Sequence, residues 1–283
     1  MRANPALERT YTGKAFGPRS ARGLCCASRP KHLAGGARSA QTFGDEDHPT
    51  TRPFQHIMPL LGSSAMLLSF DITPEAVQEH DRWHTQEHLP ERLAIPGFLR
   101  GTRWVATEGE PRYMVLYEVS NLEVLASEAY LARLNNPTPW TTRMMQHYRG
   151  MRRGLCVVVG SFGLGQGGLA ALLRFAPAPS RAKELQQWLL QDALLRVQVL
   201  AGLGSAHVLQ GAQPAAMTNE QRIRGADRGV DFAIIITGYD REAVAAVAKS
   251  LVGAGGLPDH GAVEVEHALY CTGYSLAAAE VAA

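Results

Sequence analysis

Apolar and polar residues follow a regular order from Met66 onward, with a period that switches between two and about 3.6. The pattern predicts two strands next to each other in the sequence, with helices before and after this pair. The predicted elements are a strand Met66–Ile72, a helix from Pro74, strands Leu99–Thr107 and Arg112–Ser120, helices Leu122–Leu134 and Trp140–Arg149, and a strand Leu155–Phe162. This βαββαβ order predicts a ferredoxin-like unit over residues 64–163.

The same order returns after Gly163–Gly168, a stretch typical of a linker. The second set is a strand Leu169–Ala176, a helix Ser180–Leu200, strands Ser205–Gln210 and Asp231–Tyr239, a helix Arg241–Val252 and a strand Val263–Tyr274. Aromatic, proline and glycine residues, which often have structural roles, recur 105 positions apart: Phe70 with Phe175, Pro74 with Pro179, Trp83 with Trp188, and Gly97 with Gly202. The sequence therefore predicts an internal duplication, with a degenerate second repeat over residues 169–277.

These patterns predict an α+β fold made of two ferredoxin-like βαββαβ units in tandem. A unit of this kind has a four-stranded antiparallel sheet with helices on one face only, so its other face needs a partner. We expect the two sheets to pack face to face as an α+β barrel with a pocket inside. The protein is then either a monomeric pseudo-dimer or a homodimer.

Residues 1–63 mix Arg, Gly, Ser and Pro without a sustained apolar period. Such a composition is typical of disorder. The alternative is a mis-assigned N-terminal extension, with Met58 or Met66 as the true start of the protein. The acidic stretch Asp45–Asp47 argues against an organelle transit peptide.

The amino-acid composition argues against nucleic-acid and membrane partners. The chain is 46% hydrophobic and 19% charged with a net charge of +2, which is ordinary for a globular protein and offers no basic field for nucleic acid. No apolar run approaches the roughly 18 residues that a membrane-spanning helix needs. Its four cysteines lack metal-ligand or disulfide spacing, so we expect a cytoplasmic protein without a nucleic-acid or membrane partner.

Candidate chemistry lies in the first helix. A helical wheel over Pro74–Leu89 places His80, His84 and Glu91 on the arc that should be apolar, with Glu87 close to Trp83 at one edge of the arc and His88 just beyond Val77 at the other. Burying imidazoles and carboxylates is costly unless they are hydrogen-bonded, paired or facing a wet cavity. Core packing alone therefore does not explain this face.

The second repeat lacks these groups. At the same offset, His84 corresponds to Leu189, His88 to Ala193, Glu87 to Asp192 and Arg103 to Val208. The shared scaffold therefore does not require the histidines, and any site belongs to the first repeat.

Each candidate has an assigned role and an alternative. His88 or His84 would act as general acid or base, because imidazole exchanges protons near neutral pH, and Glu87 or Glu91 would orient it. Arg103 would hold a carboxylate, enolate or phenolate oxygen, and Trp83 would be a ligand platform or a core residue. The alternative is that the histidines only satisfy local backbone groups near a helix end.

The segment Trp83–Phe98, with Arg103-Trp104, Pro139-Trp140-Thr141 and Arg152-Arg153, resembles the EthD-like branch of the dimeric α+β-barrel superfamily. The resemblance makes His88 the motif histidine, with Glu87, Trp83 and Arg103 beside it. It implies a protein that binds a small, mostly apolar organic molecule and acts by proton transfer or cofactor-independent oxygenation. Relatives include haem enzymes, but nothing beyond the histidines indicates haem, so we expect no cofactor.

Two alternatives stay open. One is a non-catalytic accessory or binding protein with structural histidines. The other is a zinc metallopeptidase, because His84–His88 fits the pattern H-x-x-E-H. Pro90 argues against the zinc site, since we expect it to end or kink the helix. The insertion Pro214–Val230 is expected to be a mobile loop.

Overall fold

The structure is a computed structural model that describes residues 59–212 and 217–281. Most of the N-terminal segment for which we expected disorder or a mis-assigned start thus lies outside the described residues. The first strand begins at Ser64. No helix in the described ranges is long and apolar enough to cross a membrane.

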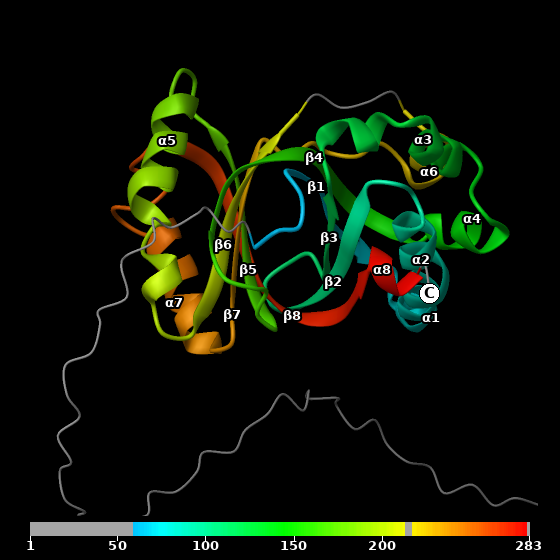
Figure 1. The fold of residues 1–283 in the computed structure, drawn as a ribbon, viewed down its shortest axis with the longest axis horizontal. Coiled ribbons are helices and arrows are strands. Elements are labelled where there is room, and N and C mark those ends of the chain that lie inside the picture. The colour runs from blue at the N-terminus through cyan, green and yellow to red at the C-terminus, as the bar shows by residue number, and fades with distance from the viewer. Residues whose placement is uncertain (1–58, 213–216, 282–283) are drawn as a thin grey trace, which may run out of the picture. The chain divides into compact units, whose positions relative to one another are not determined.

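Eight antiparallel strands close into one barrel, in the order β1-β3-β2-β8-β5-β7-β6-β4 (Figure 1). Their bounds are β1 Ser64–Ile72, β2 Phe98–Glu108, β3 Tyr113–Val119, β4 Tyr148–Gly163, β5 Leu169–Pro177, β6 Leu203–Gly211, β7 Phe232–Gly238 and β8 Ala262–Ala277. The expected α+β fold of two tandem ferredoxin-like units forming a barrel is confirmed.

The two sheets face each other across the barrel interior, as expected, and their edges also join. Strand β2 pairs with β8, and β4 pairs with β6, so the long strands β4 and β8 each pair with strands of both repeats. Face-to-face packing alone would leave four strand edges with unpaired N–H and C=O groups, and closure pairs these edges. This is why one chain completes the barrel.

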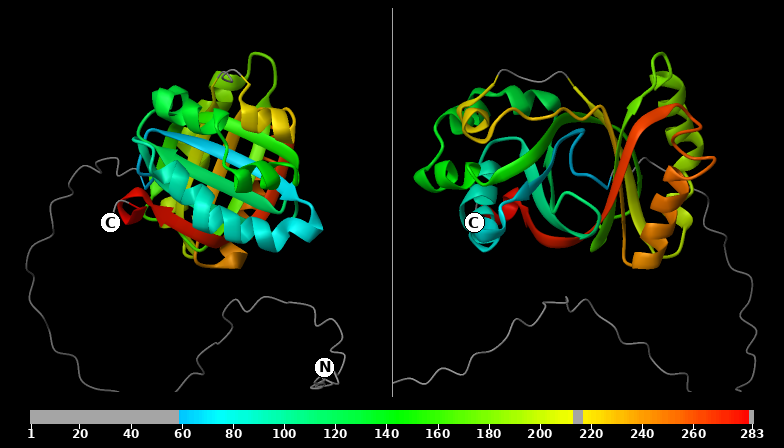
Figure 2. Two further views of the ribbon diagram at one scale, coloured as in Figure 1. Left: turned by 90° about the vertical axis from the view of Figure 1, so that its right-hand side faces the viewer. Right: turned by 180° about the vertical axis from the view of Figure 1, so that it is seen from behind.

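The helices cover the barrel from outside, in two groups on opposite sides (Figure 2). The first repeat carries the 3₁₀ turns η1 Pro74–Ala76 and η3 Leu122–Ala126, helices α1 Val77–Trp83, α2 Leu89–Leu93, α3 Glu128–Asn135 and α4 Pro139–Met145, and the π-helical turn η2 His84–His88. The second carries α5 Ala182–Trp188, the π-helical turn η4 Leu189–Ala193, the 3₁₀ turn η5 Val197–Val199, α6 Asn219–Arg224, α7 Arg241–Val252 and α8 Ala278–Val281. Of these, α6 and α8 lie on the side of the first repeat, among its helices.

Alternation along each strand separates the cores. In β1, Ala65 and Leu67 face the barrel interior, while Met66 and Phe70 face the helices of the first repeat. In β5, Leu172 faces the same interior and Leu173 faces the helices of the second repeat. The molecule thus has one shared core inside the barrel and one core beneath each helical layer.

The duplication extends to details of the backbone. The offset of 105 relates β1 to β5, α1 to α5 and η2 to η4, and it relates Gly97 to Gly202, which have φ angles of +93° and +90°. In both π-helical turns an N–H reaches the carbonyl five residues back, from Leu89 to His84 and from Leu194 to Leu189. The turn is therefore a property of the scaffold and not evidence of a site.

The backbone corrects three predictions. Helix α4 ends at Met145, and β4 begins at Tyr148, seven residues before the predicted strand. Pro90 does not end its helix, because the wider π-helical turn before it removes the need for an N–H at position 90, and α2 continues to Leu93. The described part of the insertion contains a helix, α6, that packs on the first repeat.

Leu67 and Leu172 test whether the interior is one core, because they are equivalent residues that line it from different repeats. Changing either to Ala should lower the free energy of unfolding by about 2–5 kcal/mol. The control Leu164→Ala, at a side chain that is 69% exposed, should cost below about 0.5 kcal/mol. Chemical denaturation should show one common transition in each variant, and separate transitions for the two repeats would contradict a shared core.

Candidate functional site

Three buried histidines form a row on one face of the continuous helix α1–η2–α2. His80, His84 and His88 are 0%, 1% and 6% exposed, and successive ring centroids are 5.4 and 5.6 Å apart. Burial lowers the pKa of all three imidazoles, those of His84 and His88 far below the usual value. The row is therefore neutral at physiological pH.

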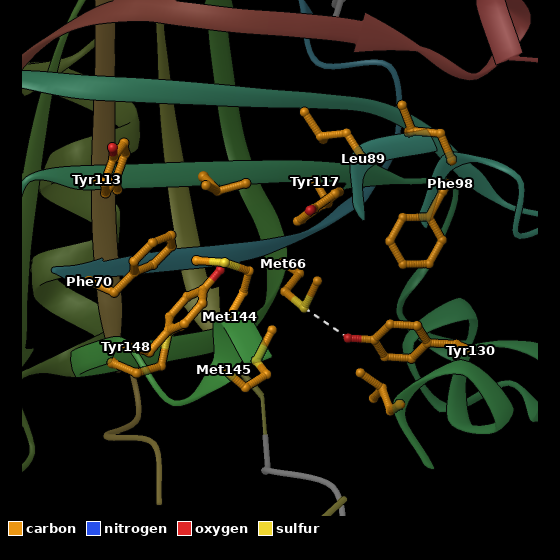
Figure 3. Packing of buried hydrophobic residues seen from close by; sticks show 14 of the residues in the cluster. Met66, Phe70, Leu89, Phe98, Tyr113, Tyr117, Tyr130, Met144, Met145 and Tyr148 are labelled. Atoms are coloured by element: carbon orange, nitrogen blue, oxygen red, sulfur yellow. Dashed lines mark hydrogen bonds between the residues drawn. The ribbon is translucent and has the colours of Figure 1, made fainter. Parts of the chain in front are cut away.

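Aromatic residues from the sheet face this row. The pairs are Tyr148 Oη with His80 Nε2, at 3.3 Å, and Tyr117 Oη with His84 Nε2, at 3.4 Å. Burial raises the pKa of both phenols, so each hydroxyl keeps its proton and can donate a hydrogen bond to a neutral imidazole. Figure 3 shows Tyr117 and Tyr148 in the same packed layer as Phe70 and Met144.

Asp81 connects one end of the row to the surface. Its Oδ1 atom accepts a hydrogen bond from Tyr113 Oη at 2.8 Å and lies 3.4 Å from His80 Nδ1. Arg103 is 6% exposed and lies beside this carboxylate, with Nε to Oδ1 at 3.7 Å. Although burial acts to raise it, the contacts with His80, Tyr113 and Arg103 lower the pKa of Asp81.

The described hydrogen bonds of Glu87 are with a tryptophan and two threonines, not with a histidine. Its Oε1 atom accepts hydrogen bonds from Trp83 Nε1 at 3.1 Å, from Thr138 Oγ1 at 2.6 Å and from Thr141 Oγ1 at 3.3 Å. It therefore ties α1 and η2 to α4 and holds the indole ring, which packs against His88 with 4.4 Å between centroids and 35° between the ring planes. The carboxylate that lies beside a histidine of the row is that of Asp81, next to His80.

Glu91 lies at the margin of the site. Its carboxylate is 3.7 Å from Arg133 Nη1 on α3, and its side chain is 21% exposed. The helix turns this residue toward α3, and none of its described interactions is with the histidine row. The substrate-binding role predicted for Glu91 stays a prediction.

Helix α6 brings charged residues of the second repeat over the first. Glu220 and Arg92 form an ion pair at 2.5 Å, in which both side chains are almost fully buried. Arg224 binds Asp227 in its own loop and also contacts Met145 Sδ on α4. Asn219 is hydrogen-bonded to Asn135 at the end of α3. The α2 end of the histidine row is thus enclosed by a segment from the other repeat.

Unpaired polar atoms gather in this layer. Among the described residues, five buried side-chain nitrogens have no hydrogen-bond partner: His84 Nδ1, His88 Nδ1, Arg92 Nη1, Arg103 Nε and Trp104 Nε1. Trp104 lies in the barrel interior, and the other four belong to the histidine helix or to the strand beneath it. Their counterparts in the second repeat are all apolar: Leu189, Ala193, Val197 and Val208.

The larger cavities lie elsewhere. One of about 300 Å³ runs between the loop after α6 and strand β4, with Arg153, Gln221 and Asp227 in its lining. An apolar groove of about 440 Å³ lies in the second repeat, between Gly160 and Leu190. In the described ranges, no three His, Cys, Asp or Glu side chains gather as metal ligands would.

The sequence identified part of this arrangement. It located His84, His88, Trp83 and Arg103, which the fold brings into one layer. The important partners that it missed come from distant strands and loops: Asp81 with Tyr113, Tyr117, Tyr148, and Arg92 with Glu220. His80 was detectable, because it occupies the same helical face one turn before His84.

Comparison with known proteins gives the class of fold. No protein-family model and no curated protein matches the sequence. An anthrone oxidase-like protein of known structure matches 80% of this chain and 97% of its own, with a TM-score of 0.55 and 13% identity. A protein from Fusobacterium nucleatum, named for a proposed monooxygenase activity, matches 77% of this chain and 96% of its own, with a TM-score of 0.50 and 10% identity.

These likenesses establish the fold as that of the ferredoxin-like, dimeric α+β barrels. At such low sequence identity the similarity shows the fold and does not show the function. The chain therefore joins in one polypeptide two units of the type that the superfamily fold uses, and its chemistry must be argued from its own residues.

The buried histidines predict how stability depends on pH. Because their pKa values are lowered on folding, the unfolded chain binds more protons below about pH 6.5, and the free energy of unfolding falls as the pH decreases. Each such histidine contributes up to about 1.4 kcal/mol per pH unit. His207, in the barrel interior, has its pKa lowered by burial to about 3 and adds to the same trend.

The variant His84→Leu restores the residue of the second repeat. Combined with Tyr117→Phe, which removes the buried hydroxyl that would otherwise lose its partner, it should raise the free energy of unfolding at neutral pH by about 1–3 kcal/mol, because the unpaired Nδ1 atom of His84 is removed. It should also make the pH dependence shallower by about one proton. Urea denaturation at several pH values measures both, and a loss of stability at neutral pH would show that His84 is satisfied in the folded protein.

Proposed function

We propose that this protein is an EthD-like α+β-barrel protein that binds a small, mostly apolar organic molecule at the histidine row. It acts there by proton transfer or by cofactor-independent oxygenation, in the cytoplasm. His84 and His88 handle the proton, Arg103 holds an oxygen of the ligand, and Trp83 forms one wall. Glu87 positions Trp83 rather than reacting.

The unpaired nitrogens carry this proposal. Each buried polar atom without a partner costs about 1–3 kcal/mol, and the second repeat shows that the same backbone folds with apolar side chains at all four positions. The fold therefore does not require these four polar side chains, although each lowers the stability of the protein. Their presence is explained if an oxygen or nitrogen atom of a ligand forms hydrogen bonds with them.

The surroundings fit an apolar molecule with few polar atoms. The layer contains Phe70, Trp83, Tyr113, Tyr117 and Tyr148, and it has the flexible side chains of Met144 and Met145 next to them. Methionine adapts its shape easily, so this layer can open around a ligand without breaking hydrogen bonds. A neutral imidazole in such surroundings can accept a proton without first losing one.

The comparisons support the same class of chemistry. Both structural relatives are named for oxidation chemistry, one as anthrone oxidase-like and one as a proposed monooxygenase. The histidine row lies between helices and sheet of the first repeat, on the side of the sheet away from the barrel interior.

A second candidate is a binding or accessory protein without catalysis. Its support is the burial of the row, which fits histidines that only fill space beside tyrosines. The zinc-peptidase alternative has less support, because Glu87 is held by Trp83, Thr138 and Thr141 instead of facing a site shared with His84 and His88.

A thermal-shift screen of small aromatic and aliphatic compounds on the full chain tests the proposal. We expect at least one compound to raise the melting temperature of the unmodified protein and to have little effect on His88→Ala, the residue found in the second repeat. Binding at about 100 times Kd corresponds to about 2.7 kcal/mol of added stability. The control His267→Ala changes an exposed histidine of β8 and should keep the full response.

If compounds stabilise the unmodified protein and His88→Ala equally, the histidine row is not the binding site. If one compound binds at the row but is never consumed or altered, as followed by mass spectrometry with and without oxygen, the binding or accessory function is the correct one.

A further inference from the structure

Asp81, His80 and Tyr148 lie in line from the surface to the interior of the first repeat. From this geometry we infer that the three side chains form a proton relay between water and the histidine site. The inference rests on the proposed function for the identity of the proton donor, but the relay itself is a property of the unliganded protein.

The hydrogen bonds fix the direction of the relay. The ionised carboxylate of Asp81 can only accept, so His80 Nδ1, 3.4 Å away, must carry the ring proton of the neutral imidazole. His80 Nε2 is then the acceptor, and it takes a hydrogen bond from Tyr148 Oη at 3.3 Å. One tautomer therefore satisfies both contacts, and its ring joins two groups that do not touch each other.

The two ends of the line lie in different surroundings. The Asp81 side chain is 38% exposed, so its carboxylate can exchange protons with water directly. Tyr148 is 5% exposed, and its ring packs 4.6 Å from Phe70 and 6.4 Å from Trp83. Among the described contacts, the hydrogen bond to His80 is therefore what links the Tyr148 hydroxyl to the surface.

The neighbouring groups hold the relay in this state. Arg103 donates through Nη1 to the backbone oxygen of Asp81 at 3.1 Å, and Tyr113 donates to its carboxylate. These contacts keep Asp81 ionised and in place, while burial keeps His80 neutral. A fixed carboxylate beside a neutral imidazole sets the tautomer, as in other acid–base assemblies.

The second repeat has no such line. At the corresponding positions it carries Gln186, Leu185 and Ala262, and the strand registers of the two repeats agree, since Tyr148 pairs with Ile72 and Ala262 pairs with Pro177. The scaffold therefore folds without any of the three groups, as it does without the unpaired atoms of the histidine row.

The proton step balances over the three side chains. A ligand at the row gives a proton to Tyr148 Oη as the hydroxyl proton passes to His80 Nε2, and the Nδ1 proton passes to Asp81 and on to water. No electron is transferred, and the ligand becomes its conjugate base. Return of the proton runs the same steps backward and restores the original tautomer, which suits removal and replacement of an acidic proton on one molecule.

The exchange of tyrosine hydroxyl protons with water tests the relay without any ligand. Isotope shifts of the Tyr ring carbons in mixed water and deuterium oxide report this rate for single tyrosines in the full chain. Asp81→Ala and His80→Leu should slow the exchange of the Tyr148 hydroxyl by about tenfold or more, the lower range of effects expected for positioned acid–base groups. The ring nitrogen shifts of His80 should show a proton on Nδ1 in the unmodified protein.

Two comparisons separate a relay from general opening of the structure. Tyr117 is hydrogen-bonded to His84, whose Nδ1 has no hydrogen-bond partner, so the exchange of the Tyr117 hydroxyl should not change in Asp81→Ala. Glu79→Gln alters an exposed carboxylate of the same helix that binds only Trp140 among its described contacts, and it should leave Tyr148 unchanged.

Equal slowing of both tyrosines in Asp81→Ala, or no change at Tyr148, would overturn the relay. A proton on His80 Nε2 in the unmodified protein would overturn it as well. These results are independent of the ligand screen: a failed screen with slowed Tyr148 exchange rejects the proposed function and keeps the relay.

Discussion

The closure of the eight-stranded barrel is the constraint on which the rest of the molecule depends. Each four-stranded sheet would leave two strand edges with unpaired backbone groups, and β2 with β8 and β4 with β6 satisfy all of them within one chain. Closure also creates an interior core that both repeats fill, with Leu67 and Leu172 at equivalent places. Because the barrel supplies this stability, the two outer helical layers are free to differ.

Because the outer helical layers can differ, the first repeat tolerates a layer with buried, unpaired polar atoms that lower its stability. Both repeats keep the same π-helical turn, the same offset and the same left-handed glycine, so the backbone was not changed to make a site. Only the side chains differ, with imidazoles, arginines and tyrosines in one layer and leucines, valines and alanines in the other. Two copies in one chain thus act as a control for each other, and this comparison separates what the fold needs from what it merely permits.

The site nevertheless draws on both repeats. Helix α6 belongs to the longer loop of the second repeat, yet its Glu220 forms a buried ion pair with Arg92 beside the histidine row. A buried pair of this kind contributes little net stability but strongly favours one arrangement of its partners, since leaving either charge alone would be costly. The insertion therefore fixes how the first repeat is enclosed, and a single isolated repeat would lack that part of the site.

Hydrophobic periodicity by itself determined the element order, the duplication and the anomalous histidines, because it records local conformation and which face of each element is buried. The contrast between His84 and Leu189 was visible without any structure. Only tertiary structure decided which groups meet: Glu87 turns to Thr138, Asp81 takes the place beside His80, and Tyr148 arrives from a strand that begins earlier than predicted. Such contacts depend on strand register and helix packing between residues far apart in the chain, and no local pattern encodes them.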